Sequence, residues 1–198
     1  MNGSLFEALG VLRSGGVILY PTDTIWGLGC DATDPAAVDR IFRIKNRPDS
    51  KSLVLLASDL DMVTRYVKAI PEIALDLVAV NDKPMTIIYP DAVVAAAEDK
   101  PDKRFLARNA VAADGSVGIR IPLMPELCDM IRRFGRPVVS TSANVSGEPS
   151  PKRFADIPES IRAAVDYVVD PTLESSSSGL ASQIIKLSLS GEIQIIRM

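Results

Sequence analysis

The residues from Ser140 to Gly147 are the segment of this chain with the clearest capacity to bind a ligand. Five of these eight residues are small and polar and another is glycine, and the segment directly follows the apolar residues 137–139. The apolar residues predict a buried strand, and the polar residues predict the loop at its carboxyl end, where open α/β sheets bind ligands. If that loop is extended, Ser142 and Asn144 point the same way. Together they would offer a hydroxyl, an amide donor and an amide acceptor to one small polar molecule.

A cationic cluster is formed by Lys45, Arg47 and Lys51. Pro48 disfavours the helical conformation for Arg47, and in an extended segment Lys45 and Arg47 would lie on the same side. Arginine binds phosphate through two nitrogens and lysine binds it as a point charge, so this arrangement suits a phosphate clamp. The alternative is a solvated helix end whose cations interact with the helix dipole, and charge runs usually face solvent.

Arg120 is a further candidate because it lies within a predicted strand over residues 117–121. Alternation along that strand would turn the apolar residues toward the core, and Gly118 and Arg120 toward the opposite face. Beside a glycine, Arg120 would have room to bind a carboxylate or a phosphate. It could equally be an outward-facing charge, although a partly buried arginine needs an anionic partner.

Two other patterns indicate structure rather than binding. Gly27 to Ala32 matches the G-x-G-x-x-A dinucleotide fingerprint, but six residues separate it from the preceding strand and the helix cap comes only at Asp34. We therefore interpret these glycines as turn glycines. Ser175 to Ser178 predict a solvated, mobile loop, with a lid over a site as the alternative.

The chain contains no histidine. This removes the commonest general base and the commonest transition-metal ligand. Any catalysis must therefore use lysine, arginine, serine, threonine, carboxylates or the groups of the substrate itself.

The composition is 47% hydrophobic and 24% charged, which is typical of a soluble globular protein, and no linker divides residues 1–198. We expect one domain. The net charge of −3 argues against a nucleic-acid coat protein but leaves room for a local basic pocket. Two cysteines suggest neither a disulfide framework nor a zinc site, and they fit the reducing cytoplasm. We expect no signal peptide and no membrane span.

Helical and strand patterns alternate along the chain, which predicts an α/β fold. We expect helices near residues 4–14, 35–44, 58–67, 71–80, 125–134 and 157–165, and strands at 17–20, 53–56, 85–89, 117–121, 137–139, 166–169, 184–187 and 193–197. The segment 91–116 is ambiguous and is interpreted as a loop with some helix. The last two strands form a hairpin across Ser190 and Gly191, so the sheet should be mixed rather than purely parallel.

Several motifs follow one another in a fixed order: Tyr20 to Thr24 with Gly27 to Gly29, Lys45-x-Arg47-Pro48, Gly118 to Pro122, Ser142-x-Asn144, and Ser182 with the terminal Ile-Ile-Arg197. In this order and spacing they resemble the YrdC-like family of threonylcarbamoyl-adenylate synthases over nearly the whole chain. The resemblance implies the short, single-domain form of the family. Its fold would be a twisted mixed sheet flanked by helices, with an open concave pocket.

The resemblance also implies a reaction. L-threonine, bicarbonate and ATP give threonylcarbamoyl-AMP and pyrophosphate, and the product supplies the threonylcarbamoyl modification of a tRNA adenosine. Mg²⁺ would arrive with the phosphates of ATP rather than in a protein metal site. The tRNA and the threonylcarbamoyl-transferase machinery are the further partners implied. A chain without histidine suits this chemistry, because displacement at phosphorus needs alignment and charge neutralisation more than a protein nucleophile.

The family resemblance implies roles for ten residues. By resemblance, the nucleotide would be held by Lys45, Arg47, Lys51, Ser116, Asn144 and Arg197. Threonine would be held by Thr24, Arg120, Ser142 and Ser182, with Arg120 pairing with its carboxylate. Catalysis would rest on Lys45, Arg47, Ser142 and Asn144.

Some positions depart from the family pattern. Residues 83–86 (Lys-Pro-Met-Thr) replace a turn that usually contains Pro-Gly-Pro, and Leu56 and Met124 stand where histidine is common. Such changes could alter which amino acid is accepted. The alternative function is therefore a divergent paralogue that binds RNA or a nucleotide without this activity, and the intact Ser142-x-Asn144 element favours activity.

Overall fold

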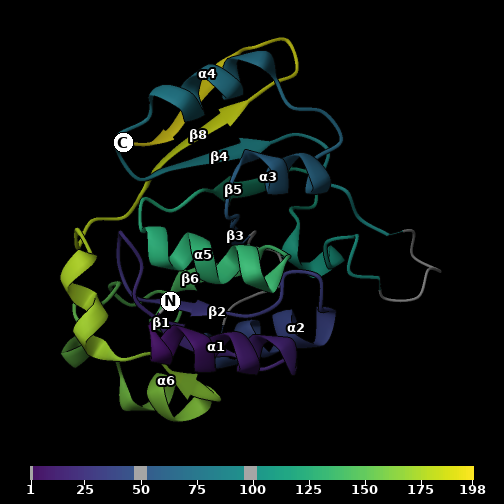
Figure 1. Ribbon diagram of the computed structural model, residues 1–198. Coiled ribbons are helices and arrows are strands. Elements are labelled where there is room, and N and C mark those ends of the chain that lie inside the picture. The colour runs from purple at the N-terminus through teal and green to yellow at the C-terminus, as the bar shows by residue number, and fades with distance from the viewer. Residues whose placement is uncertain (1, 47–52, 96–101) are drawn as a thin grey trace.

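The computed structural model describes residues 2–46, 53–95 and 102–198. The strands in these ranges are β1 (Ile18–Tyr20), β2 (Gly27–Gly29), β3 (Val54–Leu56), β4 (Met85–Tyr89), β5 (Val117–Arg120), β6 (Val138–Ser142), β7 (Tyr167–Val168), β8 (Gln183–Leu187) and β9 (Ile193–Arg197). They form one sheet in the order β7-β1-β2-β6-β3-β5-β4-β8-β9 (Figure 1).

The sheet is mixed, as the sequence predicts. The pairs β1–β7, β3–β5 and β4–β8 are parallel, whereas the other neighbours are antiparallel. The closing hairpin is β8 and β9. Because β3, β5 and β6 are neighbours, residues far apart in the sequence meet at the middle of the sheet. The α/β fold class is confirmed.

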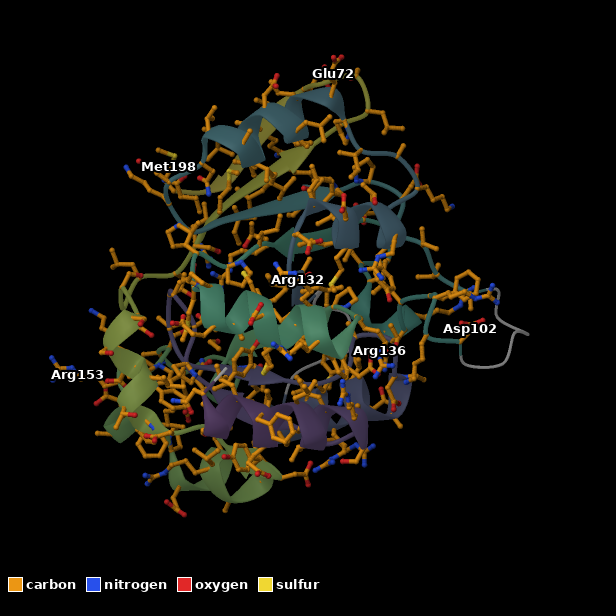
Figure 2. The ribbon with its side chains drawn as sticks, in the orientation of Figure 1. Glu72, Asp102, Arg132, Arg136, Arg153 and Met198 are labelled. Atoms are coloured by element: carbon orange, nitrogen blue, oxygen red, sulfur yellow. The ribbon has the colours of Figure 1, made fainter. Side chains whose placement is uncertain are left out.

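The helices are α1 (Gly3–Arg13), α2 (Pro35–Ile44), α3 (Leu60–Tyr66), α4 (Glu72–Val80), α5 (Pro125–Phe134) and α6 (Glu159–Ala164), with 3₁₀ turns η1 (Arg108–Ala110), η2 (Phe154–Asp156) and η3 (Pro171–Ser176). Figure 1 shows α1 and α5 side by side in front of the sheet, and α3 and α4 over its β4–β8 end. The inner face of α5 buries Leu127, Met130 and Ile131. Its outer face carries Arg132, labelled in Figure 2, which is paired with Asp129 at 2.8 Å.

Strand β5 has the alternation that its sequence predicts. Ile119 contributes to a small apolar cavity of about 60 Å³ together with Val63 of α3 and Val78 of α4. Gly118 and Arg120 instead line a much larger cleft on the opposite face. The two faces of one strand therefore separate the helix-covered core from a surface that can receive a ligand.

The positions of Ser4 and Ser58 predict them as the N-caps of α1 and α3, but the structure has other residues as both caps. The N-cap of α1 is Asn2, whose side chain accepts from the Ser4 amide at 2.8 Å, whereas the Ser4 hydroxyl lies 3.0 Å from that of Tyr167. The cap of α3 is Asp59 rather than Ser58, because the Asp59 carboxylate reaches the Met62 amide at 2.9 Å. In both cases the prediction missed the true cap by one or two residues, since adjacent polar residues compete for one position.

The segment 175–178 is exposed as predicted, except for half-buried Ser177, but the prediction of a loop was wrong for its first two residues. Its first two residues belong to η3, which Asp170 caps by accepting from the Thr172 amide at 2.9 Å. The Ser177 amide then donates to the Glu174 carbonyl at 2.9 Å. The segment therefore has a defined conformation, and its further contacts are described below.

The interpretation of Gly27 and Gly29 as turn glycines was also wrong, because both belong to β2. At Gly29 a Cβ atom would lie 2.5 Å from the Tyr20 ring and 3.0 Å from the Val139 carbonyl oxygen. Because glycine has no side chain, β1, β2 and β6 pack closely at this point. This close packing, rather than the binding of a cofactor, explains the glycine.

We expect Gly29→Ala to lower the free energy of unfolding by about 1–3 kcal/mol, because the added methyl group overlaps the Tyr20 ring. Gly10→Ala is the matched control, since a Cβ there meets nothing within 4 Å and Gly10 lies inside α1. The control should stabilise the protein by up to about 1 kcal/mol. Urea unfolding of both variants measures the difference, and equal effects would contradict the close-packing argument.

Candidate functional site

A cleft of about 760 Å³ opens on the face of the sheet that carries Gly118 and Arg120. Residues of β2, β3, β4, β5, β6, β8 and β9 line it, together with residues from the loops 22–26, 112–116 and 181–182. Its volume is in the usual range for a small-molecule site. The expected concave pocket is therefore present.

Arg120 forms one polar pocket of the cleft with Thr22, Asp23 and Thr24. The guanidinium makes an ion pair with the Asp23 carboxylate, and both side chains are nearly inaccessible to solvent. Its Nη2 atom donates to the Thr24 hydroxyl at 3.2 Å and to the Thr22 hydroxyl at 3.4 Å. The anionic partner that a buried arginine needs is thus Asp23.

Asp23 also fixes the loop that follows β5. Its second carboxylate oxygen accepts from the Leu123 amide at 3.0 Å. The carboxylate therefore connects the loop after β1 to the loop after β5, and it balances the Arg120 charge inside the protein. A pocket built in this way holds a guanidinium in a fixed orientation beside two hydroxyls, which suits recognition of a small anion.

Lys45 contacts the loop that leaves β6 from inside the protein, and the residue is 1% exposed. Its Nζ donates to the Ser142 carbonyl, to the Asn144 carbonyl at 2.6 Å and to Asn144 Oδ1 at 3.2 Å. The Ser146 amide donates in turn to the Lys45 carbonyl at 2.8 Å. Lys45 therefore holds the shape of this loop from inside the protein.

The side chains of Ser142 and Asn144 meet, as predicted, but they do not both face the cleft. The Ser142 hydroxyl donates to Asn144 Oδ1, and Ser142 also lines the cleft. The Asn144 amide nitrogen donates to the Glu148 carbonyl at 2.6 Å and to the Val145 carbonyl at 3.1 Å. The expectation that Asn144 presents its amide donors to a ligand was wrong for this conformation, because the loop's own carbonyls accept them.

The extended backbone that the cationic clamp requires was wrongly predicted at residues 45 and 46. Lys45 has φ −84° and ψ −5°, as the C-cap of α2, and Asn46 has a positive φ of 47°. The influence of Pro48 reaches only the residue before it. Arg47 and Lys51 lie outside the described residues.

Ser116 lines the cleft near an ion pair between Asp114 and Lys186. The Ser116 hydroxyl donates to Asp114 Oδ1 at 2.6 Å, and Lys186 Nζ lies 2.9 Å from Asp114 Oδ2. Hydrogen bonds from the Lys186 ammonium, which has the largest effect, and from the Ser116 hydroxyl and amide hold the pKa of the Asp114 carboxyl well below its usual range. Asp114 is therefore an anion at neutral pH and orients both Ser116 and Lys186.

Ser182 and Arg197 meet at the other side of the cleft. The Ser182 hydroxyl lies 2.8 Å from that of Thr86, and its carbonyl accepts from Arg197 Nε at 3.0 Å and Nη2 at 2.7 Å. Burial lowers the pKa of the Arg197 guanidinium. The pairing of β8 with β4 and β9 brings these three residues together.

The structure brings most of the predicted site residues to one cleft. Those that line it are Thr24, Ser116, Arg120, Ser142, Ser182 and Arg197. Lys45 and Asn144 lie just beneath, in contact with Ser142. Residues as distant in sequence as 24 and 197 therefore surround a single space.

The sequence reasoning missed several polar residues of the cleft. Two of them, Thr22 and Asp23, belong to the Pro-Thr-Asp-Thr turn. Asp23 could have been predicted, because a buried Arg120 needs an anionic partner. Thr86 and the Asp114–Lys186 pair gave no signal, since each is polar in an otherwise ordinary strand or loop. Leu56 and Met124, which depart from the family pattern, are buried and are not among the described residues that line the cleft.

In the described ranges, no group of three or more cysteine, aspartate or glutamate residues could hold a metal ion. Both cysteines are free. Within the same ranges, the helices are too short or too polar for any of them to cross a bilayer.

Comparisons with known proteins give one consistent family. The family model Sua5_yciO_yrdC, described as "Telomere recombination", matches residues 10–198. The threonylcarbamoyl-AMP synthase of Stenotrophomonas maltophilia is 33% identical over 194 residues, which are 96% of each chain. That of Xanthomonas euvesicatoria is 36% identical over 169 residues, or 84% of each chain.

Two solved structures share the fold. The P. abyssi Sua5 protein, crystallised with L-threonine, superposes with a TM-score of 0.77 at 26% identity, over 92% of this chain and 50% of that one. E. coli YciO superposes with a TM-score of 0.75 at 25% identity, over 98% of this chain and 87% of that one. This chain therefore spans about half the length of the P. abyssi protein.

Proposed function

This chain belongs to the Sua5/YciO/YrdC family, and we propose that it is a threonylcarbamoyl-AMP synthase. It would convert L-threonine, bicarbonate and ATP into threonylcarbamoyl-AMP and pyrophosphate. The observation that carries the proposal is that six site residues expected from the family resemblance, between positions 24 and 197, line one cleft. The curated relatives of that name, which cover most of both chains, support it.

The reaction needs two bond-forming steps. The threonine amine attacks the carbon of bicarbonate and gives a carbamate with loss of water. A carbamate oxygen then attacks the α-phosphorus of ATP, and pyrophosphate leaves. Neither step requires a protein nucleophile, so alignment and charge neutralisation are what the cleft must supply.

We assign the threonine carboxylate to the Arg120 pocket. The guanidinium there is oriented by Asp23 and lies beside the Thr22 and Thr24 hydroxyls. Ser142 and Ser182 would supply further hydroxyls around the amino acid. The crystal structure of the P. abyssi protein with L-threonine supports an amino-acid site in this fold.

We assign the nucleotide to the remaining part of the cleft. Ser116 and Arg197 line it, and Arg47 and Lys51 would add charge from a segment outside the described residues. Lys45 and Asn144 would act by holding the loop after β6. Magnesium would enter with the phosphates, because the described residues offer it no carboxylate cage, and we derive no step through a protein-bound metal.

We further propose that the product is used in the cytoplasm for threonylcarbamoyl modification of tRNA. A labile adenylate must be passed on before water destroys it, so a transferase and its tRNA substrate are the partners that this product requires.

The test of the function is pyrophosphate release from ATP with threonine and bicarbonate omitted in turn. We expect release only when both are present, together with threonylcarbamoyl-AMP detected by mass. Release without threonine would instead indicate a nucleotide hydrolase. Absence of release from folded protein that binds ATP would contradict the proposed synthase activity.

A further inference from the structure

The segment of residues 174–179, here called the serine segment, contacts the back of the loop that builds the Arg120 pocket. The Ser177 hydroxyl donates to the Thr22 carbonyl. The Ser178 amide donates to the Asp23 carbonyl at 2.9 Å, and the Gly179 amide donates to the Thr24 carbonyl at 2.8 Å. Three consecutive residues of the serine segment therefore hold three consecutive residues of the pocket loop.

The same segment also holds the neighbouring wall of the cleft. One oxygen of the Glu174 carboxylate accepts from Trp26 Nε1 and from the Phe154 amide, both at 2.5 Å. The rings of Trp26 and Phe154 pack with their centroids 5.1 Å apart. Trp26 lines the cleft, and its carbonyl accepts from the Ala143 amide at 3.1 Å, next to Ser142. Glu174 is thus connected through Trp26 to the loop after β6.

The pocket loop is held from two sides. Arg120 contacts the side chains of Thr22, Asp23 and Thr24 from within the sheet, whereas the serine segment binds their backbone carbonyls from outside. A displacement of this loop by even 1 Å would move the hydroxyls that flank the guanidinium, and small displacements of this kind are costly for binding and catalysis.

We propose that Ser177 and Glu174 are positioning residues that set the affinity of the cleft for its amino-acid substrate. This inference rests on the proposed function and adds a structural determinant remote from the substrate. It assigns a role to a polar segment whose sequence indicates a solvated loop, with a lid as the alternative.

Ser177→Ala removes the hydroxyl that bonds to Thr22 and leaves the backbone bonds of Ser178 and Gly179 in place. We expect the KM for threonine to rise about fivefold, as loss of one neutral hydrogen bond implies, while the KM for ATP changes less than about twofold. Ser177→Thr restores the hydroxyl and should restore the KM for threonine. Ser175→Ala is the matched control, because the Ser175 hydroxyl bonds only within η3, to the Thr172 carbonyl.

Glu174→Gln provides a second readout that does not depend on turnover. Trp26 is the only tryptophan of the chain, and its indole N–H donates to Glu174. Replacing the carboxylate by a neutral amide should shift the Trp26 emission and raise the KM for threonine, whereas Ser175→Ala should change neither. Thermal unfolding of each variant separates this effect from a general loss of stability.

The outcomes distinguish the two proposals. Wild-type protein without threonine-dependent pyrophosphate release would overturn the proposed function, and this inference with it. Active wild-type protein with an unchanged KM for threonine in Ser177→Ala, or an equal rise in Ser175→Ala, would overturn the inference alone. A rise in Ser177→Ala that Ser177→Thr reverses would support it.

Discussion

Arg120→Ala is expected to lower kcat/KM for threonine by at least about a hundredfold, because the variant loses the one guanidinium of the Arg120 pocket. The same variant leaves Asp23 as a buried carboxylate without its cation. Removing one partner of a buried ion pair costs about 3–5 kcal/mol of stability. A loss of activity in this variant alone would therefore not distinguish the loss of the guanidinium from the loss of stability.

The pair of variants Arg120→Met and Arg120→Met with Asp23→Asn separates them. Removing both charges avoids an unpaired buried ion, so the double variant should regain most of the stability lost by the single one. It should regain no activity, because the guanidinium is still absent. Urea unfolding and steady-state kinetics for threonine measure both quantities. Recovery of turnover in the double variant would show that Arg120 serves only as the partner of Asp23.

The sequence predicts the Arg120 face of the cleft because it depends on a local rule. Alternation along β5 is a property of any strand, and it correctly separates Ile119 from Gly118 and Arg120. The nearly exact prediction of α5 has the same origin, since Pro125 at its first position and Gly135 at its end are local signals. Mixed pairing was likewise predictable from one hairpin.

The serine segment could not be predicted in this way. Four consecutive serines have no apolar periodicity, and the hydroxyl of Ser177 bonds to a carbonyl 155 residues earlier in the chain. Only the three-dimensional fold brings η3 against the loop after β1. The sequence did not predict strand β2 for a related reason. Its Gly-Leu-Gly sequence has weak β-propensity, and close packing against Tyr20 and Val139 makes glycine suitable there.

The cationic residues show that a sequence motif does not determine where its side chains point. Lys45 was identified as important from its charge and its neighbours, but its environment is a set of buried carbonyl groups beneath β6. A charge run in a sequence indicates neither burial nor direction. The amide of Asn144 is a second example, because the carbonyls that accept its donors belong to its own loop.

Lys45→Met is expected to lower kcat/KM by about a hundredfold, with effects on both threonine and ATP. Methionine has a similar length but donates no hydrogen bond, so the buried Asn144 carbonyl loses its charged donor, whereas the Ser142 carbonyl keeps the Asn144 amide at 2.9 Å. Each buried acceptor left unsatisfied costs about 1–3 kcal/mol, and the loop after β6 should relax. Lys68→Met makes the same chemical change at an exposed lysine and should leave kinetics and stability unchanged.

The position of Lys45 makes its effect dependent on Ser142. The Ser142 hydroxyl donates to the Asn144 oxygen that Lys45 also binds, so the two variants disturb one network. Ser142→Ala alone should lower kcat/KM for threonine by about tenfold, and its effect in the Lys45→Met background should be much smaller, since groups in one network are not additive. Steady-state kinetics of the four proteins measure this coupling. Independent, multiplicative losses would mean that Lys45 acts on the substrates directly, and wild-type turnover in Lys45→Met would remove it from the site.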